Sequence, residues 1–589
     1  MNISLSAYWQ LLRRYLKPQS GAVLLMVALL LTSIGLQLVG PQVARSFIDA
    51  AQARASEGVL MQTALVFILV SVVQQVMNAL ATYWSERVAW TATNALRAEL
   101  AAHLVRLDMG FHKARTPGEL IERVDGDVNA LAGFFSSFVV QLIGSALLLV
   151  GVLVAVYLID TRMGLAFTVF ALLALALLGW VRRFGASHWK EDRERSAAFY
   201  GYVGEVLTTT EDIRSSGAVQ YAMLRFFEHL RQWLPVRMRA EIWGSAVWMA
   251  AAGIFAAGDA IAYGLGGSLF KGGAISLGAV YLVVAYTVML AAPIETIRTQ
   301  LQDLQRADAG VARVRELMEI RSRLEDGTDI IPAGALAVEF RAVHFAYEDE
   351  RPAEVRADEE RVGTLEDLSF RLEAGRSLGL LGHTGSGKTT IARLLFRLYD
   401  AQRGEVCLGD INLRHAKIEA LRARVGIVTQ DVQLFEASLR DNITFFNAGI
   451  SDERLFVVLE TLGLKPWLAR LPRGLDTIIS GSSLSAGEAQ LLALARVFIK
   501  DPGLVILDEA SSRLDPATEA LLEQALGKLF EGRSAIIIAH RMATVERVDD
   551  ILILERGCIV EHGPREKLAA EVHSRFAELR RAGLGEVLV

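Results

Sequence analysis

Six long stretches in the first half of the chain carry almost no charge and are rich in leucine, valine and alanine. Each is close to the ~20 residues that an α-helix needs to cross the hydrocarbon core of a bilayer. We therefore predict a membrane domain of six spanning helices. Their approximate limits are residues 21–43, 61–84, 134–158, 164–181, 242–270 and 275–294.

The composition agrees with a membrane location and excludes other classes of protein. Hydrophobic residues make up 52% of the chain and the mean hydropathy is +0.34, so apolar surface must face something other than water. A length of 589 residues is too great for one core, and two or more domains are expected. The net charge of -5 provides no basic field, so we expect no nucleic-acid partner. Cys407 and Cys558 have no zinc-ligand spacing, and we expect them to fill packing positions in a reducing compartment.

The linkers between the spans alternate between short and long. The two long linkers, residues 85–133 and 182–241, are charged, helical in pattern and rich in arginine. Because lysine and arginine accumulate on the cytoplasmic side of a membrane, we expect both long linkers and both termini in the cytosol. The membrane helices are expected to continue into these linkers. This pattern predicts a multi-pass protein of the cytoplasmic (inner) membrane of a bacterium, with residues 5–15 at the membrane interface and no cleavable signal peptide.

Asp259 is an acidic residue inside a predicted span. A carboxylate at that depth is costly unless it is paired or lines a wet cavity, so it is a candidate functional group. The alternative is a structural pair with a polar neighbour such as Arg45, near the end of the first span. The sequence leaves both interpretations open.

A change in composition marks the end of the membrane half. Residues 301–318 form a charged amphipathic pattern typical of a helix, and residues 321–332 turn polar around Asp326-Gly327. From Leu336 onward, short β-branched runs alternate with helical patterns, which is typical of an α/β domain. We therefore predict a six-helix all-α transmembrane domain over residues 1–325 and an α/β P-loop NTPase domain over residues 326–589.

A glycine-rich loop in the second domain is the strongest chemical signal in the chain. It lies between a predicted strand, residues 377–381, and a predicted helix, residues 391–399. In that context the G-x-x-x-x-G-K-[ST] pattern predicts a phosphate cradle of backbone N–H groups at a helix N-terminus. Lys388 is expected to reach the β- and γ-phosphates, and the Thr389 hydroxyl to bind Mg²⁺. The predicted nucleotide-binding residues here are Gly382, His383, Thr384, Gly385, Ser386, Gly387, Lys388, Thr389 and Thr390.

Two further strand ends carry candidate catalytic groups. The apolar run 504–508 ends in Asp508, a candidate Mg²⁺ ligand, and is followed by Glu509, a candidate general base for the attacking water. The buried run 536–539 is followed by His540, a candidate donor to the γ-phosphate, for which a satisfied core histidine is the alternative. Upstream of the loop, the Tyr347 ring is a candidate for stacking on a nucleotide base. The acidic stretch 348–363 between them is interpreted as an exposed insertion with no assigned role.

The whole pattern resembles an ATP-binding cassette (ABC) exporter whose membrane domain is fused ahead of one nucleotide-binding domain. The most specific motif is 484–488, LSAGE, which is similar to the LSGGQ signature, with Ser485 and Gly487 matching and Ala486 and Glu488 departing from it. The remaining matches cover both halves of the chain. They are Tyr347 at the base-stacking position, Gln430 at the glutamine loop, residues 512–515 with Asp515 at the SALD loop, His540 at the switch position, and residues 116–123 and 200–214 at the two coupling loops.

The resemblance implies ATP and Mg²⁺ as cofactors and sites shared between two chains. Gln430 would join Thr389 and Asp508 at the metal, and Glu509, His540 and Gln430 would serve hydrolysis. Ser485, Gly487 and Glu488 would hold the γ-phosphate of ATP bound to a second half-transporter. The departures at the signature and at Arg513 favour a heterodimer over a homodimer by a small margin.

The cargo does not follow from the sequence. A lipid, a drug-like compound, a peptide and a natural product all remain open, with the lipid bilayer itself as a partner. An ATP-gated channel or regulatory cassette without vectorial pumping is the alternative function, although the presence of Glu509 favours a pump. A soluble cassette ATPase acting on DNA or ribosomes is excluded by the predicted spans.

Overall fold

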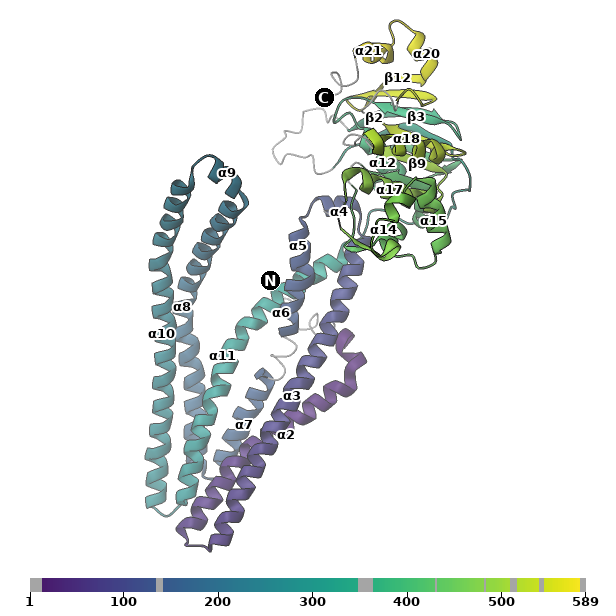
Figure 1. Cartoon of the computed structure of the whole chain (residues 1–589). Helices are drawn as coiled ribbons and strands as arrows, with labels where there is room; N and C mark the ends of the chain where they lie inside the picture. Colours follow the sequence, from purple (N-terminus) through teal and green to yellow (C-terminus); the bar gives the residue numbers. More distant parts are fainter. Residues whose placement is uncertain are drawn as a thin grey trace. The chain divides into compact units, whose positions relative to one another are not determined.

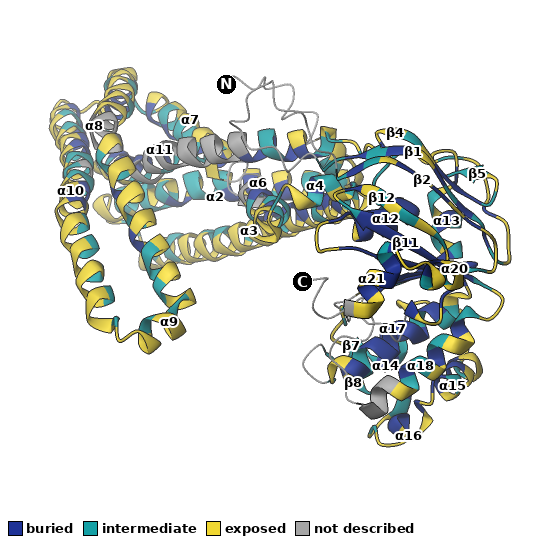
Figure 2. Ribbon diagram, turned by 90° about the horizontal axis from the view of Figure 1, so that it is seen from above, coloured by how far each residue is buried: buried dark blue, intermediate teal, exposed yellow. Residues whose placement is uncertain are grey.

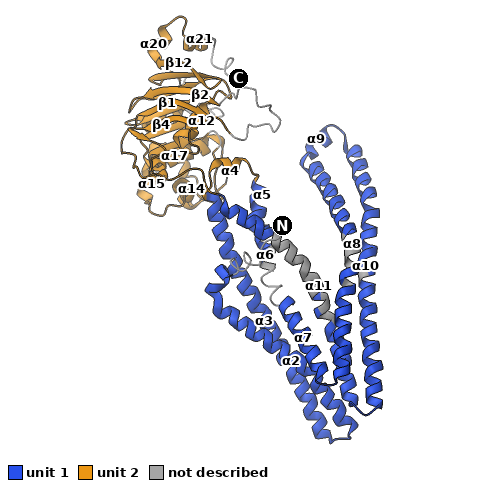
Figure 3. Ribbon diagram, turned by 180° about the vertical axis from the view of Figure 1, so that it is seen from behind, with its two compact units in different colours: residues 1–105, 117–320 blue, residues 106–116, 321–589 orange. Residues whose placement is uncertain are grey.

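The computed structural model describes residues 13–133, 141–347, 364–429, 432–480, 484–508, 516–539 and 545–582. The chain divides into two compact units (Figures 1 and 3). Unit 1 comprises residues 1–105 and 117–320, and unit 2 comprises residues 106–116 and 321–589.

Unit 1 is built from helices alone in the part that the structure describes, and several of them are very long (Figure 1). The short helix α4 (Met109–Lys113) lies between α3 and α5 in sequence but belongs to unit 2. The helices of unit 1 are η1 (Lys17–Gln19), α2 (Ser20–Gln52), α3 (Glu57–Arg106), α5 (Pro117–Ile121), η2 (Glu122–Gly126), α6 (Asp127–Gly133), α7 (Gly144–Tyr157), α8 (Thr161–Thr208), α9 (Thr210–Ser215), α10 (Val219–Lys271) and α11 (Leu277–Glu319).

Within the described ranges, all six predicted spans overlap apolar helices, the third of them from residue 141 onward. By length and composition, three helical stretches are sufficient to cross a membrane: residues 13–52, 57–106 and 219–271. Three shorter apolar helices, residues 141–157, 161–177 and 277–290, occupy the other predicted positions within the described ranges. The prediction that membrane helices continue into the long linkers is confirmed, because α3, α8 and α10 run unbroken for 50, 48 and 53 residues.

The last membrane helix is longer than the sequence predicts. The pattern indicates a span that ends near residue 294 and a separate amphipathic helix from 301, but α11 is one helix with Pro293 inside it. A proline removes one backbone hydrogen bond and usually ends a helix in water. In membrane helices, neighbouring segments and local adjustments satisfy the freed carbonyl, so proline is tolerated there.

Exposure in unit 1 follows the expectation for a membrane protein. Figure 2 shows long yellow faces on its helices, whereas the strands of unit 2 are mostly dark blue. The exposed faces are apolar: on α3, Leu65, Ile68 and Leu69 are each more than half exposed. A continuous apolar surface of this kind is stable against lipid and not against water. A buried cluster that includes Val152, Met163, Ala262, Val283 and Leu290 joins α7, α8, α10 and α11.

Unit 2 is an α/β domain with three sheets. A six-stranded sheet has the order β12-β11-β3-β10-β9-β6, a four-stranded antiparallel sheet has the order β2-β1-β4-β5, and β7 pairs with β8. The strands are β1 (Val338–Phe345), β2 (Leu365–Leu372), β3 (Ser377–Leu381), β4 (Arg403–Leu408), β5 (Ile411–Asn412), β6 (Val425–Val428), β7 (Ala437–Ser438), β8 (Ile478–Ile479), β9 (Leu504–Asp508), β10 (Ser534–Ile538), β11 (Asp550–Glu555) and β12 (Cys558–Pro564). The helices are α4, α12 (Lys388–Leu395), α13 (Ile418–Arg424), α14 (Leu439–Thr444), α15 (Asp452–Thr461), α16 (Lys465–Leu468), η5 (Gly474–Asp476), α17 (Ala486–Lys500), α18 (Pro516–Phe530), α20 (Arg565–Ala570) and α21 (Arg575–Ala582).

Five strands of the six-stranded sheet are parallel, and this arrangement positions the site. The strand β10 lies between β3 and β9, with Ile538 opposite Leu380 on one side and Asp508 on the other. β6 pairs with the outer side of β9. Because neighbouring parallel strands end at the same edge of a sheet, the segments that follow β3, β6, β9 and β10 all begin at one edge.

The helix after the glycine loop differs from its predicted limits. The pattern indicates residues 391–399, but α12 begins at Lys388 and ends at Leu395. It begins earlier because Gly387, with φ +104°, forms its N-terminal cap directly after the loop. It ends earlier because Arg397 adopts φ +47°, which turns the chain out of the helix.

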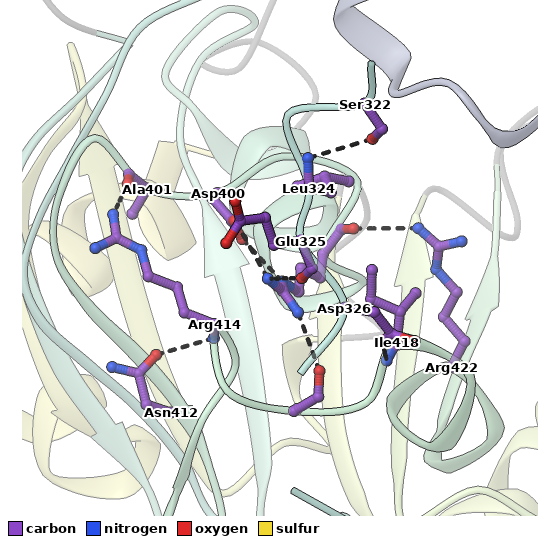
Figure 4. Close-up of polar contacts among 12 residues, drawn as sticks. Ser322, Leu324, Glu325, Asp326, Asp400, Ala401, Asn412, Arg414, Ile418 and Arg422 are labelled. Atoms are coloured by element: carbon purple, nitrogen blue, oxygen red, sulfur yellow. Dashed lines mark hydrogen bonds and ion pairs between the residues drawn. The ribbon is translucent and has the colours of Figure 1, made fainter. Parts of the chain in front are cut away.

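The segment that connects the two halves of the sequence is fixed to unit 2 by polar contacts (Figure 4). The buried guanidinium of Arg397 donates to the carbonyl oxygen of Glu325 at 2.8 Å, to that of Ala416 at 3.0 Å and to the Asp400 carboxylate at 2.9 Å. The Asp326 carboxylate accepts from the backbone N–H of Ile418, at the start of α13, at 2.7 Å. Residues 325–326 therefore belong structurally to the sheet domain.

Candidate functional site

The glycine loop joins β3 to α12, as the sequence predicts, and two of its glycines have no room for a side chain. Gly382 has φ +147° and Gly387 has φ +104°, conformations that L-residues rarely adopt. A Cβ on Gly387 would lie 2.5 Å from Leu365 Cδ2 and 3.0 Å from the Thr364 carbonyl oxygen. The loop therefore needs glycine both for its backbone turn and for its close packing against β2.

Lys388, the first residue of α12, is folded into the loop. Its ammonium donates to the carbonyl oxygens of Gly382 at 2.6 Å and His383 at 2.9 Å, and the side chain is buried. This conformation places a positive charge inside the concave side of the loop, at the N-terminus of a helix. An anion seated on the loop would meet that charge together with the backbone N–H groups.

The structure brings together two residues that are far apart in the sequence. The Thr389 hydroxyl donates to the Asp508 carboxylate at 3.3 Å, across 119 positions of the chain. The contact exists because β3 and β9 flank β10 and both end at the same edge of the sheet. A hydroxyl and a carboxylate are the oxygen ligands that Mg²⁺ takes alongside substrate phosphates.

The residues present fit a bound phosphate and a magnesium ion. The Ser386 hydroxyl oxygen is buried, and no hydrogen-bond partner is recorded for it in the part of the chain that the structure describes. A buried hydroxyl without a partner is costly, and it indicates a group that a ligand would satisfy. Together with Lys388 and the Thr389–Asp508 pair, it makes the loop suitable for a magnesium triphosphate.

Tyr347, predicted to stack on a base, lies just after β1 and is tied to α12. Its hydroxyl is 3.2 Å from the Thr390 hydroxyl and accepts from the Arg393 guanidinium at 2.9 Å. The rings of Phe345 and Tyr399 contact it edge to face, with centroids at 4.9 and 5.3 Å. These contacts hold the ring beside the first turn of the phosphate-loop helix.

Two cations at this ring were not predicted from the sequence. The Lys113 ammonium of α4 lies 4.5 Å from the Tyr347 ring centroid, and the Arg393 guanidinium lies 5.7 Å from it. For Arg393 the sequence did offer a signal. It lies three positions after Thr390 on one helix, so the two side chains share a face, and Thr390 also contacts Tyr347. Nothing in the sequence near Lys113 indicates that it contacts a tyrosine more than 200 residues away.

The signature segment forms the N-terminus of α17. Ser485 is the N-cap: its hydroxyl accepts from the Glu488 N–H at 3.2 Å, and the Glu488 carboxylate accepts from the Ser485 N–H at 2.9 Å. This reciprocal pair is a capping box. Glu488, which departs from the usual glutamine, therefore stabilises the N-terminus of the helix. Gly487 is buried in the first turn.

Four of the predicted site residues lie outside the described residues: Gln430, Glu509, Asp515 and His540. The strands that lead to three of them are in place, since β6 ends at Val428, β9 at Asp508 and β10 at Ile538. The acidic stretch 348–363 and part of the segment before the signature, residues 481–483, are also outside the described ranges.

In the membrane half, Asp259 lies on α10 and is partly buried. Its expected structural partner, Arg45, instead lies 3.6 Å from Asp49 on its own helix. No ion pair or hydrogen bond is recorded between Asp259 and any residue in the described ranges. The functional interpretation of Asp259 therefore stays a prediction.

The fold and the site together define a class: a P-loop ATPase domain that follows a bundle of membrane-spanning helices in one chain. Comparison with known proteins identifies the family. The model of the ABC transporter transmembrane region matches residues 23–294, and the ABC transporter model matches residues 365–512. The chain therefore belongs to the ABC transporters, and the predicted family and fold class are confirmed.

Known relatives and a solved structure match this chain over most of its length. A probable multidrug resistance ABC transporter ATP-binding/permease protein, YheH of Bacillus subtilis, is 30% identical over 81% of this chain and 70% of its own. An ATP-dependent lipid A-core flippase of Idiomarina loihiensis is 26% identical over 95% of each chain. The structure of a bacterial Atm1-family ABC exporter with ATP bound superposes with a TM-score of 0.78 at 25% identity, covering 97% of this chain and 99% of that one.

These relationships establish the general activity. The chain is an ATP-binding ATPase of the ABC type, and its hydrolysis is coupled to the movement of substances across a membrane. It is similar to half-transporters, which function as dimers in a membrane. The related proteins are exporters, and ATP-driven export is the general function that they support.

Proposed function

We propose that two chains close head to tail around two molecules of ATP and move a cargo out of the cytosol by alternating access. Each ATP would lie between the Lys388 loop of one chain and the Ser485 signature of the other. The observation that carries this proposal is the meeting of Lys388, Thr389 and Asp508 at one edge of the parallel sheet. The predicted domain limits of 1–325 and 326–589 stay part of the proposal for function, whereas the compact units divide between residues 320 and 321 and place residues 106–116 in unit 2.

Each residue has a role that follows from its chemistry. Lys388 and the loop N–H groups bind the phosphates, and Tyr347 and Thr390 hold the base side of the nucleotide. Thr389, Asp508 and Gln430 would hold Mg²⁺, which would neutralise negative charge on the phosphates during hydrolysis. Glu509 would take the proton of the attacking water, and His540 would donate to the γ-phosphate. His383, Thr384, Gly385 and Asp515 complete the proposed surroundings of the nucleotide.

The signature would act on the partner's nucleotide. The N-terminus of α17, with Ser485 and Gly487 in its first turn, offers N–H groups and partial positive charge to a γ-phosphate. The Glu488 carboxylate lies at the same terminus, where it weakens the attraction for a phosphate. This supports unequal ATP sites, and with Arg513 it is the reason for a slight preference for a heterodimer.

The proposed cycle couples ATP to the membrane helices. The two ATPase domains would close around bound ATP, because its γ-phosphate contacts both of them. Hydrolysis would remove this link and let the domains separate. The linkers at 116–123 and 200–214, which include α5 and α9, would carry the motion to the spans. With both termini and the ATPase domain in the cytosol of a bacterium, the spans would switch from facing inward to facing outward.

The Glu509→Gln variant tests the proposal. We expect it to retain ATP binding and to lose at least about 100-fold in turnover, because it removes the general base. Glu531→Gln, on an exposed turn after α18, is the matched control and should leave turnover unchanged. Lys388→Ala should weaken ATP binding. Undiminished hydrolysis by Glu509→Gln in a purified dimer would refute the assignment of the base.

A further inference from the structure

Within unit 1, a cavity of about 270 Å³ lies among α2, α3 and α7, with Pro293 of α11 at its side. Its wall is unusually polar for a position inside predicted spans. Three carboxamides line it, one from each region: Gln37 of α2, Asn78 of α3 and Gln141 just before α7. The Ser145 hydroxyl and the Glu86 carboxylate contribute as well.

Polar side chains at these positions are energetically unfavourable in a membrane unless they form hydrogen bonds. Gln37, Asn78, Gln141 and Ser145 all fall within the predicted spans, where each polar side chain requires a hydrogen-bond partner. Side chains of this kind often join two helices directly, and Gln141 does make a polar or electrostatic interaction. All four residues also line a common space, whose volume is just below the ~300–1,000 Å³ typical of small-molecule sites. The space suits a small molecule, or the polar end of a larger one.

The charge of the wall limits what this space accepts. Glu86 is acidic, and no lysine, arginine or histidine is among the lining residues in the described ranges. The neighbouring Arg87 places its guanidinium 5.0 Å from the Trp84 ring centroid. A carboxamide both donates and accepts hydrogen bonds, whereas an ionised carboxylate only accepts. The wall therefore favours a group that donates hydrogen bonds and carries positive charge, and it disfavours an anion.

We propose that this cavity is a cargo site for a protonated amine, with Glu86 as the charge partner and the three carboxamides orienting the group. The proposal rests on the proposed export function and names the chemical class of its cargo. It gives a role to polar residues in three spans that ATP binding leaves unexplained. By the proposed orientation, Asn78 and Pro293 lie near the cytosolic ends of their spans and Glu86 lies two residues beyond the end of the second span, on the side where cargo would enter.

Cysteine chemistry tests the charge preference without ATP. Ser145→Cys would be introduced into the full chain with Cys407→Ala and Cys558→Ser, in nanodiscs. The thiol would be modified with aminoethyl methanethiosulfonate, which is cationic, and with sulfonatoethyl methanethiosulfonate, which is anionic. Each modification rate would be divided by the rate at which the same reagent modifies free 2-mercaptoethanol. We expect the cationic reagent to be favoured by at least about tenfold, since the Glu86 carboxylate attracts the cationic reagent and repels the anionic one. Asn78→Cys provides a second reporter in case the first variant does not fold.

Matched variants assign the preference to Glu86. Adding Glu86→Gln should reduce the preference to within about twofold. Adding Glu57→Gln, an exposed glutamate at the other end of α3, should leave it unchanged. Ala146→Cys, which is exposed beside Ser145 but not on the cavity wall, should show no dependence on Glu86.

Two results would overturn the proposal. If the cationic and anionic reagents modified Ser145→Cys at equal normalised rates, and likewise Asn78→Cys, the space would have no charge preference. If neither reagent reacted, the space would be closed to polar molecules. Because the labelling requires no hydrolysis, a failure of the export function would leave these rates unaffected. The link to transport is tested by ATPase rates with dodecylamine and dodecanol: only the amine should alter the rate, and Glu86→Gln should abolish the difference.

Discussion

At the scale of single residues, the first turn of α17 illustrates how one side chain can serve structure and function at once. The Glu488 carboxylate closes a capping box with Ser485, and a glutamine at the same position could accept the same hydrogen bond. The acid therefore adds to the cap a negative charge that the cap itself does not require. That charge lies at the terminus proposed to receive the partner's γ-phosphate.

Glu488→Gln and Glu488→Ala separate these two effects. We expect the glutamine variant to keep the cap and to bind ATP more tightly in the closed dimer, because it removes a negative charge near the phosphate. The alanine variant should lose about 1 kcal/mol of stability with the cap. ATP titrations and thermal unfolding of the two variants check this. Weaker ATP binding by the glutamine variant would show that the carboxylate assists the site.

Arg397 is the residue on which the connecting segment depends. Arg397→Met keeps the buried stem and removes the hydrogen bonds to Glu325, Ala416 and Asp400. We expect unit 2 to lose about 3 kcal/mol of stability, since buried polar groups lose a charged partner. Thermal unfolding would measure the loss. Arg403→Met, at an exposed position in β4, is the control and should change stability by less than about 0.5 kcal/mol.

At the scale of elements, the five-residue helix α4 shows that sequence neighbourhood and structural membership can differ. It follows directly on the membrane helix α3, yet residues 106–116 belong to unit 2. Its Lys113 lies over the ring on which a nucleotide base is proposed to stack. An incoming base and this ammonium would compete for the same ring.

Lys113→Met is expected to raise ATP affinity about two- to fivefold, because the base no longer displaces a cation from Tyr347. Binding of inorganic triphosphate, which has no base, should not improve. Arg115→Met removes a positive charge from the same segment and controls for long-range attraction of the phosphates. Equal effects of Lys113→Met on ATP and on triphosphate would contradict competition at the ring.

At the scale of the whole molecule, the described ranges of one chain supply three helical stretches long enough to cross a membrane, three shorter apolar helices and one phosphate loop. In the proposed arrangement, the signature of that chain faces the nucleotide bound to its partner. ATP should therefore change the relation between two chains more than the fold of either. The chain offers a natural reporter: Cys407 is buried, as expected, but the expectation that Cys558 fills a packing position was wrong, because Cys558 is exposed.

Spin labels on Cys558 of a purified dimer should move to a shorter and narrower distance distribution when Mg·ATP is added to the Glu509→Gln variant. The physical reason is that bound nucleotide bridges the two ATPase domains and holds them closed. ATP without divalent metal is the control. A dimer whose label distance ignores Mg·ATP would contradict the proposed cycle, and a chain that dimerises only with a related half-transporter would establish the heterodimer.

The membrane helices and the phosphate loop could be predicted from the residue pattern alone, because both depend on local information. About 20 consecutive apolar residues satisfy the bilayer wherever they occur, and the loop residues 382–389 are contiguous. Local signals also misplaced boundaries. The proline at 293 predicts a helix end, but it lies inside α11. The limits of α12 depend on the φ angles of Gly387 and Arg397.

The meetings between distant residues depend on how the strands and helices pack in three dimensions. Thr389 reaches Asp508 because two strands flank β10 and end together, Lys113 reaches Tyr347 because α4 packs within unit 2, and the polar cavity exists because α2, α3 and α7 enclose it. Each of these contacts joins segments that are far apart in the chain. Strand order and helix packing set them, and the local residue pattern carries no signal of either.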